Sequence, residues 1–248
     1  MQIERYLHGV KRGVKLEGND LSYYMENEVE ELITELAIEH NYFPENAGIN
    51  KGNGQIIKGK YGERVCISET VYDVMHAKED ATIKLKTVKI PPEFDERYFI
   101  DPIRRSSFVT WFYGKDGRYE NIKIALKEIN NTVLYPREIF SFNKVVGPRT
   151  AKRGFQKAPS IGIPEDYGGG VCQVATTLYN AVLKADLQVI ERHEHSKPVR
   201  YVAVGNDATV AYGYYDFKFQ NNTPYPLIIN TSFRNYGVRV YIYGGEAK

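Results

Sequence analysis

A cysteine and two histidines are the side chains whose types and spacing best support catalysis. Residues 168–172 read Gly-Gly-Gly-Val-Cys, and residues 191–196 read Glu-Arg-His-Glu-His-Ser. A cysteine thiolate is a strong nucleophile, and an imidazole within hydrogen-bond reach can accept the thiol proton. Cys172 with His193 or His195 therefore predicts acyl-transfer chemistry through a covalent intermediate.

The element that positions the cysteine is predicted to be a helix. Apolar residues recur with the period of an α-helix from Val174 to Ala185, which indicates a helix over about 172–185. Three preceding glycines allow unusual backbone torsions and let a substrate approach the main chain. At a helix start, unpaired N–H groups and the positive end of the dipole stabilise a thiolate and can bind an oxyanion. We therefore expect the backbone N–H groups of Cys172 and Gln173 to form an oxyanion hole.

The histidines are predicted to lie on a strand that returns along this helix. A helix of that length spans roughly 20 Å, and an antiparallel strand covers this distance in about six residues. A strand that begins near Leu187 would regain the level of Cys172 near His193. Since strand side chains alternate between faces, Glu191, His193 and His195 would share one face, so either histidine can meet the thiol.

Other roles are open to the same residues. Asp207, in a turn-like Gly-Asn-Asp-Ala-Thr segment, is a candidate for orienting the imidazole, and an Asx turn is an equal alternative. A zinc site has the right ligand types, but a His-x-His pair is a weak signal, so we expect no metal and no cofactor. The zinc ligands in that alternative would be Glu191, His193, His195 and Cys172.

The second cysteine, Cys66, lacks a comparable setting. It lies in an Arg-Val-Cys-Ile run, which favours an inert packed residue in a strand. Two cysteines in 248 residues do not make a disulfide framework. We therefore expect no Cys66–Cys172 bridge, which leaves the thiol of Cys172 free to react.

Several linked motifs between residues 105 and 235 resemble the VanW domain. So many motifs in the same order make the resemblance specific. The matching stretches are 121–122, 133–143, 146–150, 168–174, 177–180, 191–196 and 207–213. Two turns depart from the family pattern, which usually reads Pro-Gly-Glu at 136–138 and often Ala-Gly-Leu at 185–187. This chain has Pro-Arg-Glu and Ala-Asp-Leu there, which puts the expected geometry of both turns in doubt.

The resemblance implies a bacterial cell-envelope protein, from a family named for a glycopeptide-resistance cluster. Some VanW-domain proteins are L,D-transpeptidases that use the cysteine of the Gly-Gly-Gly-x-Cys motif, here Cys172. The expected partners are peptidoglycan stem peptides, and the expected location is the cell wall or the outer face of the membrane. A cysteine peptidase or amidase of peptidoglycan, and a non-catalytic wall-binding module, are the alternatives. The residues expected to contact the substrate are Gly168, Gly169, Gly170, Gln173, Arg149 and Arg153.

Composition narrows the classes of partner. The formal net charge is +2, so neither a nucleic-acid partner nor strong attraction to anionic lipid is expected. No apolar run is long enough for a membrane helix, and residues 1–6 lack the apolar core of a signal peptide. An enzyme of the cell wall would therefore need an upstream anchor or signal. The 20 tyrosines fit half-buried strands better than a surface that stacks on sugars.

The first hundred residues read as a separate small α+β domain. A helix is expected over 26–41, and Ser68 is a candidate cap for a second helix. Residues 50–54 are turn-like with strands on either side, and a strand over 82–90 ends at two prolines. We expect domain 1 over residues 1–95, which resembles the peptidoglycan-binding domain that commonly precedes VanW. A spacer role is an equal alternative.

The second domain, over residues 96–248, is predicted to be the VanW-like catalytic domain. The expected fold class is α+β, with a mostly antiparallel sheet packed by helices. Residues 221–224 read as a hairpin turn. The expected elements are a helix over 121–130 and strands over 106–113, 199–204, 212–220, 227–233 and 238–243.

Overall fold

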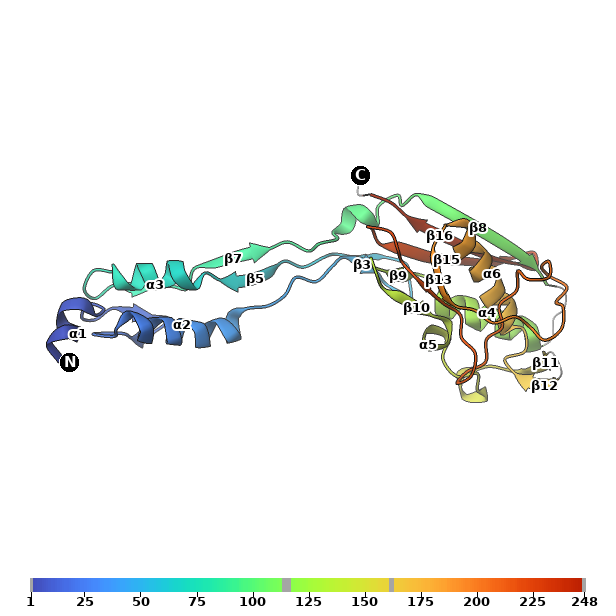
Figure 1. The fold of residues 1–248 in the computed structure, drawn as a ribbon, viewed down its shortest axis with the longest axis horizontal. Coiled ribbons are helices and arrows are strands. Elements are labelled where there is room, and N and C mark those ends of the chain that lie inside the picture. The colour runs from blue at the N-terminus through green and yellow to red at the C-terminus, as the bar shows by residue number, and fades with distance from the viewer. Residues whose placement is uncertain (1, 113–116, 161–162, 247–248) are drawn as a thin grey trace. The chain divides into compact units, whose positions relative to one another are not determined.

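The chain forms two compact units, whose elements are labelled in Figure 1. The structure is a computed structural model that describes residues 2–112, 117–160 and 163–246. Unit 1 comprises Met1–Ala47 and Lys58–Glu93, and unit 2 comprises Gly48–Ile57 and Phe94–Lys248.

Unit 1 is built on two packed helices with small sheets. The helix α2 (Glu26–His40) confirms the predicted amphipathic helix and buries Val29 and Ile33 against α3 (Ile67–Met75). The predicted cap of α3 is wrong, because Cys66 takes the N-cap position and Ser68 lies inside the first turn. The other elements of unit 1 are α1 (Gln2–His8), β1 (Lys15–Leu16), β2 (Asn19–Asp20), β5 (Gly62–Val65), β6 (Thr82–Ile83) and β7 (Thr87–Ile90).

Two strand predictions in unit 1 are wrong. The single strand expected over 82–90 is two strands that join different sheets, β6 beside β1 and β7 beside β5. Cys66 is not in a strand, because β5 ends one residue earlier. Cys66 is half-buried and its thiol is free, as is that of Cys172.

A short hairpin near residue 50 belongs to unit 2, although it lies within the sequence of the predicted first domain. The expected strands on either side of the turn are present as β3 (Gly48–Ile49) and β4 (Ile56–Ile57). The side chain of Asn131 donates a hydrogen bond to the carbonyl of Lys51 at 3.3 Å, which joins the hairpin to unit 2. Unit 1 therefore differs from the predicted domain over 1–95 by this hairpin and by residues 94–95.

Unit 2 is centred on a four-stranded antiparallel sheet, in the order β8-β16-β15-β9. Helices α4 and α6 pack on one face of this sheet, as Figure 1 shows. The α+β class with mainly antiparallel sheets is thus confirmed. The bounds are β8 (Arg104–Trp111), α4 (Gly117–Ile129), β9 (Thr132–Leu134), α6 (Val171–Lys184), β15 (Leu227–Arg234) and β16 (Gly237–Gly244).

A second antiparallel sheet, in the order β10-β14-β13, lies in the same unit. Because β14 and β15 belong to different sheets, the hairpin turn predicted at 221–224 is wrong. The remaining bounds are η1 (Glu96–Tyr98), β10 (Ile139–Ser141), α5 (Phe142–Val146), η2 (Ala151–Arg153), β11 (Lys157–Ser160), β12 (Ile163–Tyr167), β13 (Gln188–Glu191) and β14 (Lys218–Gln220).

The connection between β13 and β14, residues 192–217, contains no helix or strand beyond one isolated bridge. The strand predicted over 199–204 is therefore wrong, and only the end of the one predicted over 212–220 forms, as β14. The backbone of this connection forms hydrogen bonds within the connection, such as the one from the Thr209 N–H to the carbonyl of His193 at 2.8 Å, and with side chains of α6. For example, the N–H of Ala208 donates to Thr176 Oγ1 at 2.9 Å.

Both departures from the family pattern have unusual backbone geometry. Arg137 has φ +69° and Asp186 has φ +55°, in the left-handed region that glycine adopts without strain. These are the two positions at which the resembling pattern has glycine. Each turn therefore bears the strain of a side chain in this conformation.

Candidate active site

Cys172 is the second residue of α6, so the predicted helix is confirmed and places the thiol at the helix start. The residue is half-buried against the core of unit 2. Its Sγ donates a hydrogen bond to the carbonyl of Val210 at 3.4 Å. The thiol thus lies between the first turn of α6 and the connection over 192–217.

The first and third glycines before Cys172 make room for two arginine side chains. A Cβ on Gly168 would lie 2.7 Å from Arg149 Cγ, and one on Gly170 would lie 2.6 Å from Arg118 Cγ. Both glycines also have positive φ, at +91° and +103°. Only glycine satisfies both requirements, so the motif positions two guanidinium groups near the thiol.

The middle glycine is held by the backbone of β11 and by a buried asparagine. A Cβ on Gly169 would lie 2.5 Å from the carbonyl oxygen of Ala158. The carbonyl of Gly169 accepts a hydrogen bond from Asn121 Nδ2 at 3.0 Å, and Asn121 Oδ1 accepts one from the N–H of Gln156 at 2.7 Å. The protein's own groups therefore fill the space beside the glycines, where sequence reasoning expected the substrate.

Gln173 is part of the scaffold. Its Nε2 donates to Thr110 Oγ1 at 3.1 Å, and its Oε1 accepts from Arg118 Nη2 at 3.0 Å. Its backbone N–H donates to the carbonyl of Gly170 at 3.0 Å. This N–H is engaged, which argues against its predicted place in an oxyanion hole.

Burial disfavours the thiolate form of Cys172. Burial raises the pKa of the Cys172 thiol, and the hydrogen bond to Val210 and the charges of Arg149 and Arg118 offset only part of this effect. The expected helix-start thiolate is therefore not the resting state. A base must take the proton before the sulfur can attack.

His195 and Asp207 form a histidine–carboxylate pair. Asp207 Oδ2 accepts hydrogen bonds from His195 Nδ1 at 2.5 Å and from the His195 backbone N–H at 2.7 Å. Burial opposes ionisation of Asp207, but these two hydrogen bonds outweigh it and lower its pKa. With Nδ1 donating to the carboxylate, Nε2 is the basic nitrogen of the neutral ring. The contact predicted between Asp207 and an imidazole is thus present for His195.

His193 has different surroundings. Its Nε2 lies 3.0 Å from Glu191 Oε1, and its ring lies 4.7 Å from that of Tyr215. Glu191 also forms an ion pair with Lys218 at 2.8 Å, which is the main cause that lowers the pKa of Glu191 to about 2. Because β13 ends at Glu191, both histidines lie beyond the strand, and the shared strand face that we expected for them is wrong.

The residues of the zinc alternative are separated into different pairs. Glu191 bonds to His193, whereas His195 bonds to Asp207. Within the described part of the chain, no three His, Cys, Asp or Glu side chains are grouped so that they could hold a metal ion.

The two arginines that we expected to bind substrate differ in how their donors are used. Arg153 Nη1 donates to the carbonyls of Val146 and Pro148, and Nη2 lies 3.7 Å from Glu128. Arg149 Nη1 and Nη2 are fully buried and have no hydrogen-bond partner among the described residues. Arg153 therefore holds its own loop, and Arg149 has unused donors near the thiol.

Sequence reasoning missed two residues of this site. Burial raises the pKa of the Tyr201 phenol, and so do the nearby Cys172 and Asp207, so the ring lies among the candidate catalytic groups. Arg118, in the first turn of α4, lies close enough to Cys172 to lower the pKa of its thiol. Neither residue lies in a recognisable sequence motif. Tyr201 is one of 20 tyrosines and Arg118 is one of 33 lysines and arginines, and no neighbouring residue distinguishes either one.

A thiol at a helix start, two neighbouring guanidinium groups and a histidine–carboxylate pair define an α+β protein with a candidate acyl-transfer site. All of these groups lie within residues 117–243, which match the family described as VanW like protein and make up half of the chain. The chain belongs to the VanW family.

Two curated proteins are similar to this chain. The uncharacterized protein YoaR of Bacillus subtilis (strain 168) is 37% identical over 203 residues, which cover 78% of this chain and 66% of YoaR. The vancomycin B-type resistance protein VanW of Enterococcus faecalis (strain ATCC 700802 / V583) is 27% identical over 117 residues, which cover 44% of this chain and 42% of that protein. No solved structure matches the chain. Among the described residues, no helix has the length and apolar content needed to cross a membrane.

Proposed function

We propose that this protein is a cysteine-dependent acyltransferase of the bacterial cell wall, an L,D-transpeptidase that acts on peptidoglycan stem peptides outside the cytoplasm. Two observations carry the proposal: the free thiol of Cys172 at the start of α6, and the His195–Asp207 pair in the connection over 192–217, whose Val210 carbonyl accepts the hydrogen bond of that thiol. Membership of the VanW family supports a cell-wall role.

The first step would form a thioester. His195 Nε2 takes the proton of Cys172, and Sγ attacks the carbonyl carbon of the third residue of a tetrapeptide stem. The tetrahedral intermediate collapses as the bond to the terminal D-alanine breaks, and the leaving amine takes the proton from His195. Before this step the thiol must give up its hydrogen bond to Val210. Catalytic hydrogen bonds commonly tighten only when substrate is bound.

The second step would return the thiol. An amine of a neighbouring stem loses a proton to His195 Nε2 and attacks the thioester carbonyl. The carbon–sulfur bond breaks, Cys172 Sγ is reprotonated, and a 3-3 cross-link results. If water replaces the amine, the same residues give a cysteine peptidase.

For unit 1 we propose peptidoglycan binding. A groove of about 930 Å³ lies among its helices. The exposed rings of Tyr6 and Tyr72 and the partly exposed ring of Tyr23 line it, and aromatic rings of this kind can stack on sugars or peptides. A spacer role would predict that Tyr72→Ala leaves binding to cell-wall sacculi unchanged.

Product analysis tests the reaction. The protein is incubated with purified tetrapeptide muropeptides, and the products are separated and identified by mass spectrometry, with Cys172→Ala as the control. Dimeric products with released D-alanine, present only with Cys172, support the transpeptidase. Hydrolysed monomers would show a peptidase, and binding without turnover would show a wall-binding module.

A further inference from the structure

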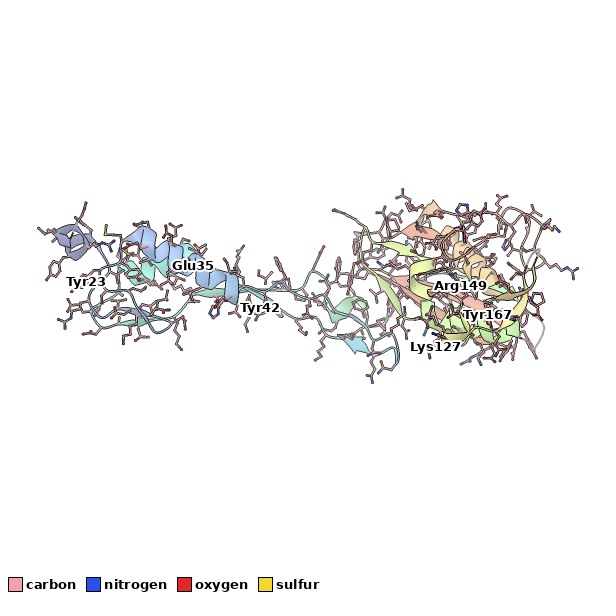
Figure 2. The ribbon with its side chains drawn as sticks, turned by 90° about the horizontal axis from the view of Figure 1, so that it is seen from below. Tyr23, Glu35, Tyr42, Lys127, Arg149 and Tyr167 are labelled. Atoms are coloured by element: carbon pink, nitrogen blue, oxygen red, sulfur yellow. The ribbon has the colours of Figure 1, made fainter. Side chains whose placement is uncertain are left out.

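Arg149 carries a buried positive charge whose terminal nitrogens are unused. Both nitrogens are inaccessible to solvent and lack hydrogen-bond partners in the described part of the chain. Its guanidinium carbon lies 5.8 Å from the ring of Phe142 and 5.9 Å from that of Tyr212. Figure 2 labels Arg149 in unit 2. Two aromatic faces attract a cation but satisfy none of its N–H donors.

The nearby acidic residue does not serve as its partner. Asp216 lies close enough to influence Arg149. Its Oδ2 accepts a hydrogen bond from the Ser141 hydroxyl at 2.5 Å, and its Oδ1 accepts from the backbone N–H groups of Asn143 and Phe217 at 2.8 Å each. The carboxylate of Asp216 is committed to these donors. An unpaired buried charge is costly to a fold, so an outside anion is the natural complement of Arg149.

A buried acceptor without a partner occurs in the same region. Asn143 Nδ2 donates to the carbonyls of Ala211 and Tyr215, whereas Asn143 Oδ1 is buried and unpaired among the described residues. Asn143 follows Phe142 and bonds to Ala211, and Phe142 and Tyr212 are the two residues whose rings face Arg149. The segments 142–143 and 211–212 therefore contact both groups that lack a partner among the described residues. These groups are the terminal nitrogens of Arg149, which donate, and Asn143 Oδ1, which accepts.

We propose that Arg149 binds the free α-carboxylate of the residue that leaves the acyl donor, with Asn143 Oδ1 available to that residue's N–H. This inference rests on the proposed function and names its substrate class. The donor is a peptide whose scissile bond is its last one. A guanidinium matches a carboxylate with two parallel hydrogen bonds, which a carboxamide cannot reproduce.

The glycine motif contributes to this specificity. Arg149 reaches its position only because Gly168 has no Cβ. The same loop that begins α6 therefore sets the distance between the thiol and the guanidinium. A stem extended by one residue would place its carboxylate beyond Arg149 when its third carbonyl meets Cys172, and it would be a poor donor.

Binding to an inactive protein tests the inference independently of turnover. Cys172→Ala protein is titrated with a tetrapeptide stem and with the same peptide as its C-terminal carboxamide, and binding is followed by calorimetry. We expect the carboxylate to bind roughly 10- to 100-fold more tightly. Adding Arg149→Gln should abolish this preference, whereas adding Lys152→Gln, which removes an exposed cation three residues away, should leave it intact.

The outcomes separate this inference from the proposed function. Equal binding of both peptides, or a preference that survives Arg149→Gln, overturns the carboxylate site. If, in addition, wild-type protein forms an acyl adduct with both peptides at equal rates, the transpeptidase proposal stands without the carboxylate site at Arg149. A carboxylate preference in protein that never forms an adduct supports the site and contradicts the enzyme. The comparison of two peptides on one protein does not depend on how Arg149→Gln folds.

Discussion

At the scale of single residues, the structure distinguishes between the two histidines that could act as the base. Sequence spacing admits either histidine, whereas the structure pairs Asp207 with His195 and leaves His193 on Glu191 and Tyr215. A carboxylate on Nδ1 fixes the tautomer and the orientation of the ring. We therefore propose His195 as the base.

Substitution of the two histidines tests this assignment. We expect His195→Ala to lower the rate of Cys172 acylation by about 100- to 10,000-fold, as loss of a general base does. We expect Asp207→Asn to lower the rate as well, and His193→Ala to have an effect below about tenfold. Intact-mass kinetics with a tetrapeptide donor measure all three. A loss confined to His193→Ala would contradict the assignment.

The reactivity of the thiol should report its neighbours. Because burial raises the pKa of Cys172 and Arg149 partly offsets it, alkylation by iodoacetamide should increase with pH up to a midpoint above that of an ordinary cysteine. Arg149→Gln should move this midpoint further up. Lys152→Gln is the matched control, and an unchanged midpoint in Arg149→Gln would show that the guanidinium does not act on the thiol.

Part of the site was readable from the sequence because its signals are local. A triglycine before a cysteine, and histidines a fixed distance on, point to Cys172, His193 and His195 without a structure. Arg118 and Tyr201 could not be found this way, because they reach the thiol only through the packing of α4 and of the connection over 192–217. The proposal of Arg149 rather than Arg153 as the carboxylate-binding residue likewise depends on which donors lack partners among the described residues.

At the scale of elements, the sequence predicted the helices α2 and α6 correctly, but it wrongly predicted a strand within the connection over 192–217. The apolar period of α2 and α6 is repeated over several turns, so it identified them closely. Residues 199–204 have the composition of a strand, but no neighbouring edge pairs with them. Strand propensity describes a side chain on a sheet and cannot show that a sheet edge is available.

The two turns with positive φ give a prediction about stability. Replacing Arg137 or Asp186 with glycine should raise the free energy of unfolding by about 0.5–1 kcal/mol each, since glycine adopts the left-handed conformation without strain. Urea denaturation measures the change. Arg137→Ala is the control, because alanine keeps the strain, and it should leave the stability within about 0.5 kcal/mol. Equal effects of glycine and alanine would show that strain is not the cause.

At the scale of the whole molecule, the order of segments in the chain differs from their grouping in space. The hairpin of β3 and β4 lies between two segments of unit 1 in sequence, yet it belongs to unit 2. A linear reading assigns each stretch to one domain, so it gave a single boundary after residue 95 and could not detect that residues 48–57 belong to unit 2. The signal is a long-range contact, from Asn131 to Lys51.

The free energy of unfolding should decrease at acid pH as Glu191 becomes protonated. Its pKa is about 2 in the folded chain and 4.5 ordinarily, so its stabilising effect is complete above about pH 4.5 and is lost as pH falls toward 2. The ion pair with Lys218 is partly solvated, so we expect a loss of roughly 1 kcal/mol. The free energy of unfolding of wild type and of Glu191→Gln, compared between about pH 6 and about pH 3, measures this loss. Parallel curves for the two proteins would exclude this role.

The proposed thioester can be detected by the mass of the protein after brief exposure to a tetrapeptide stem. We expect an adduct with the mass of the stem less its terminal D-alanine, located on Cys172 by peptide mapping and removed by hydroxylamine as a thioester. Cys172→Ala should show none. An adduct on another residue, or cross-linked product formed equally by Cys172→Ala, would contradict the account.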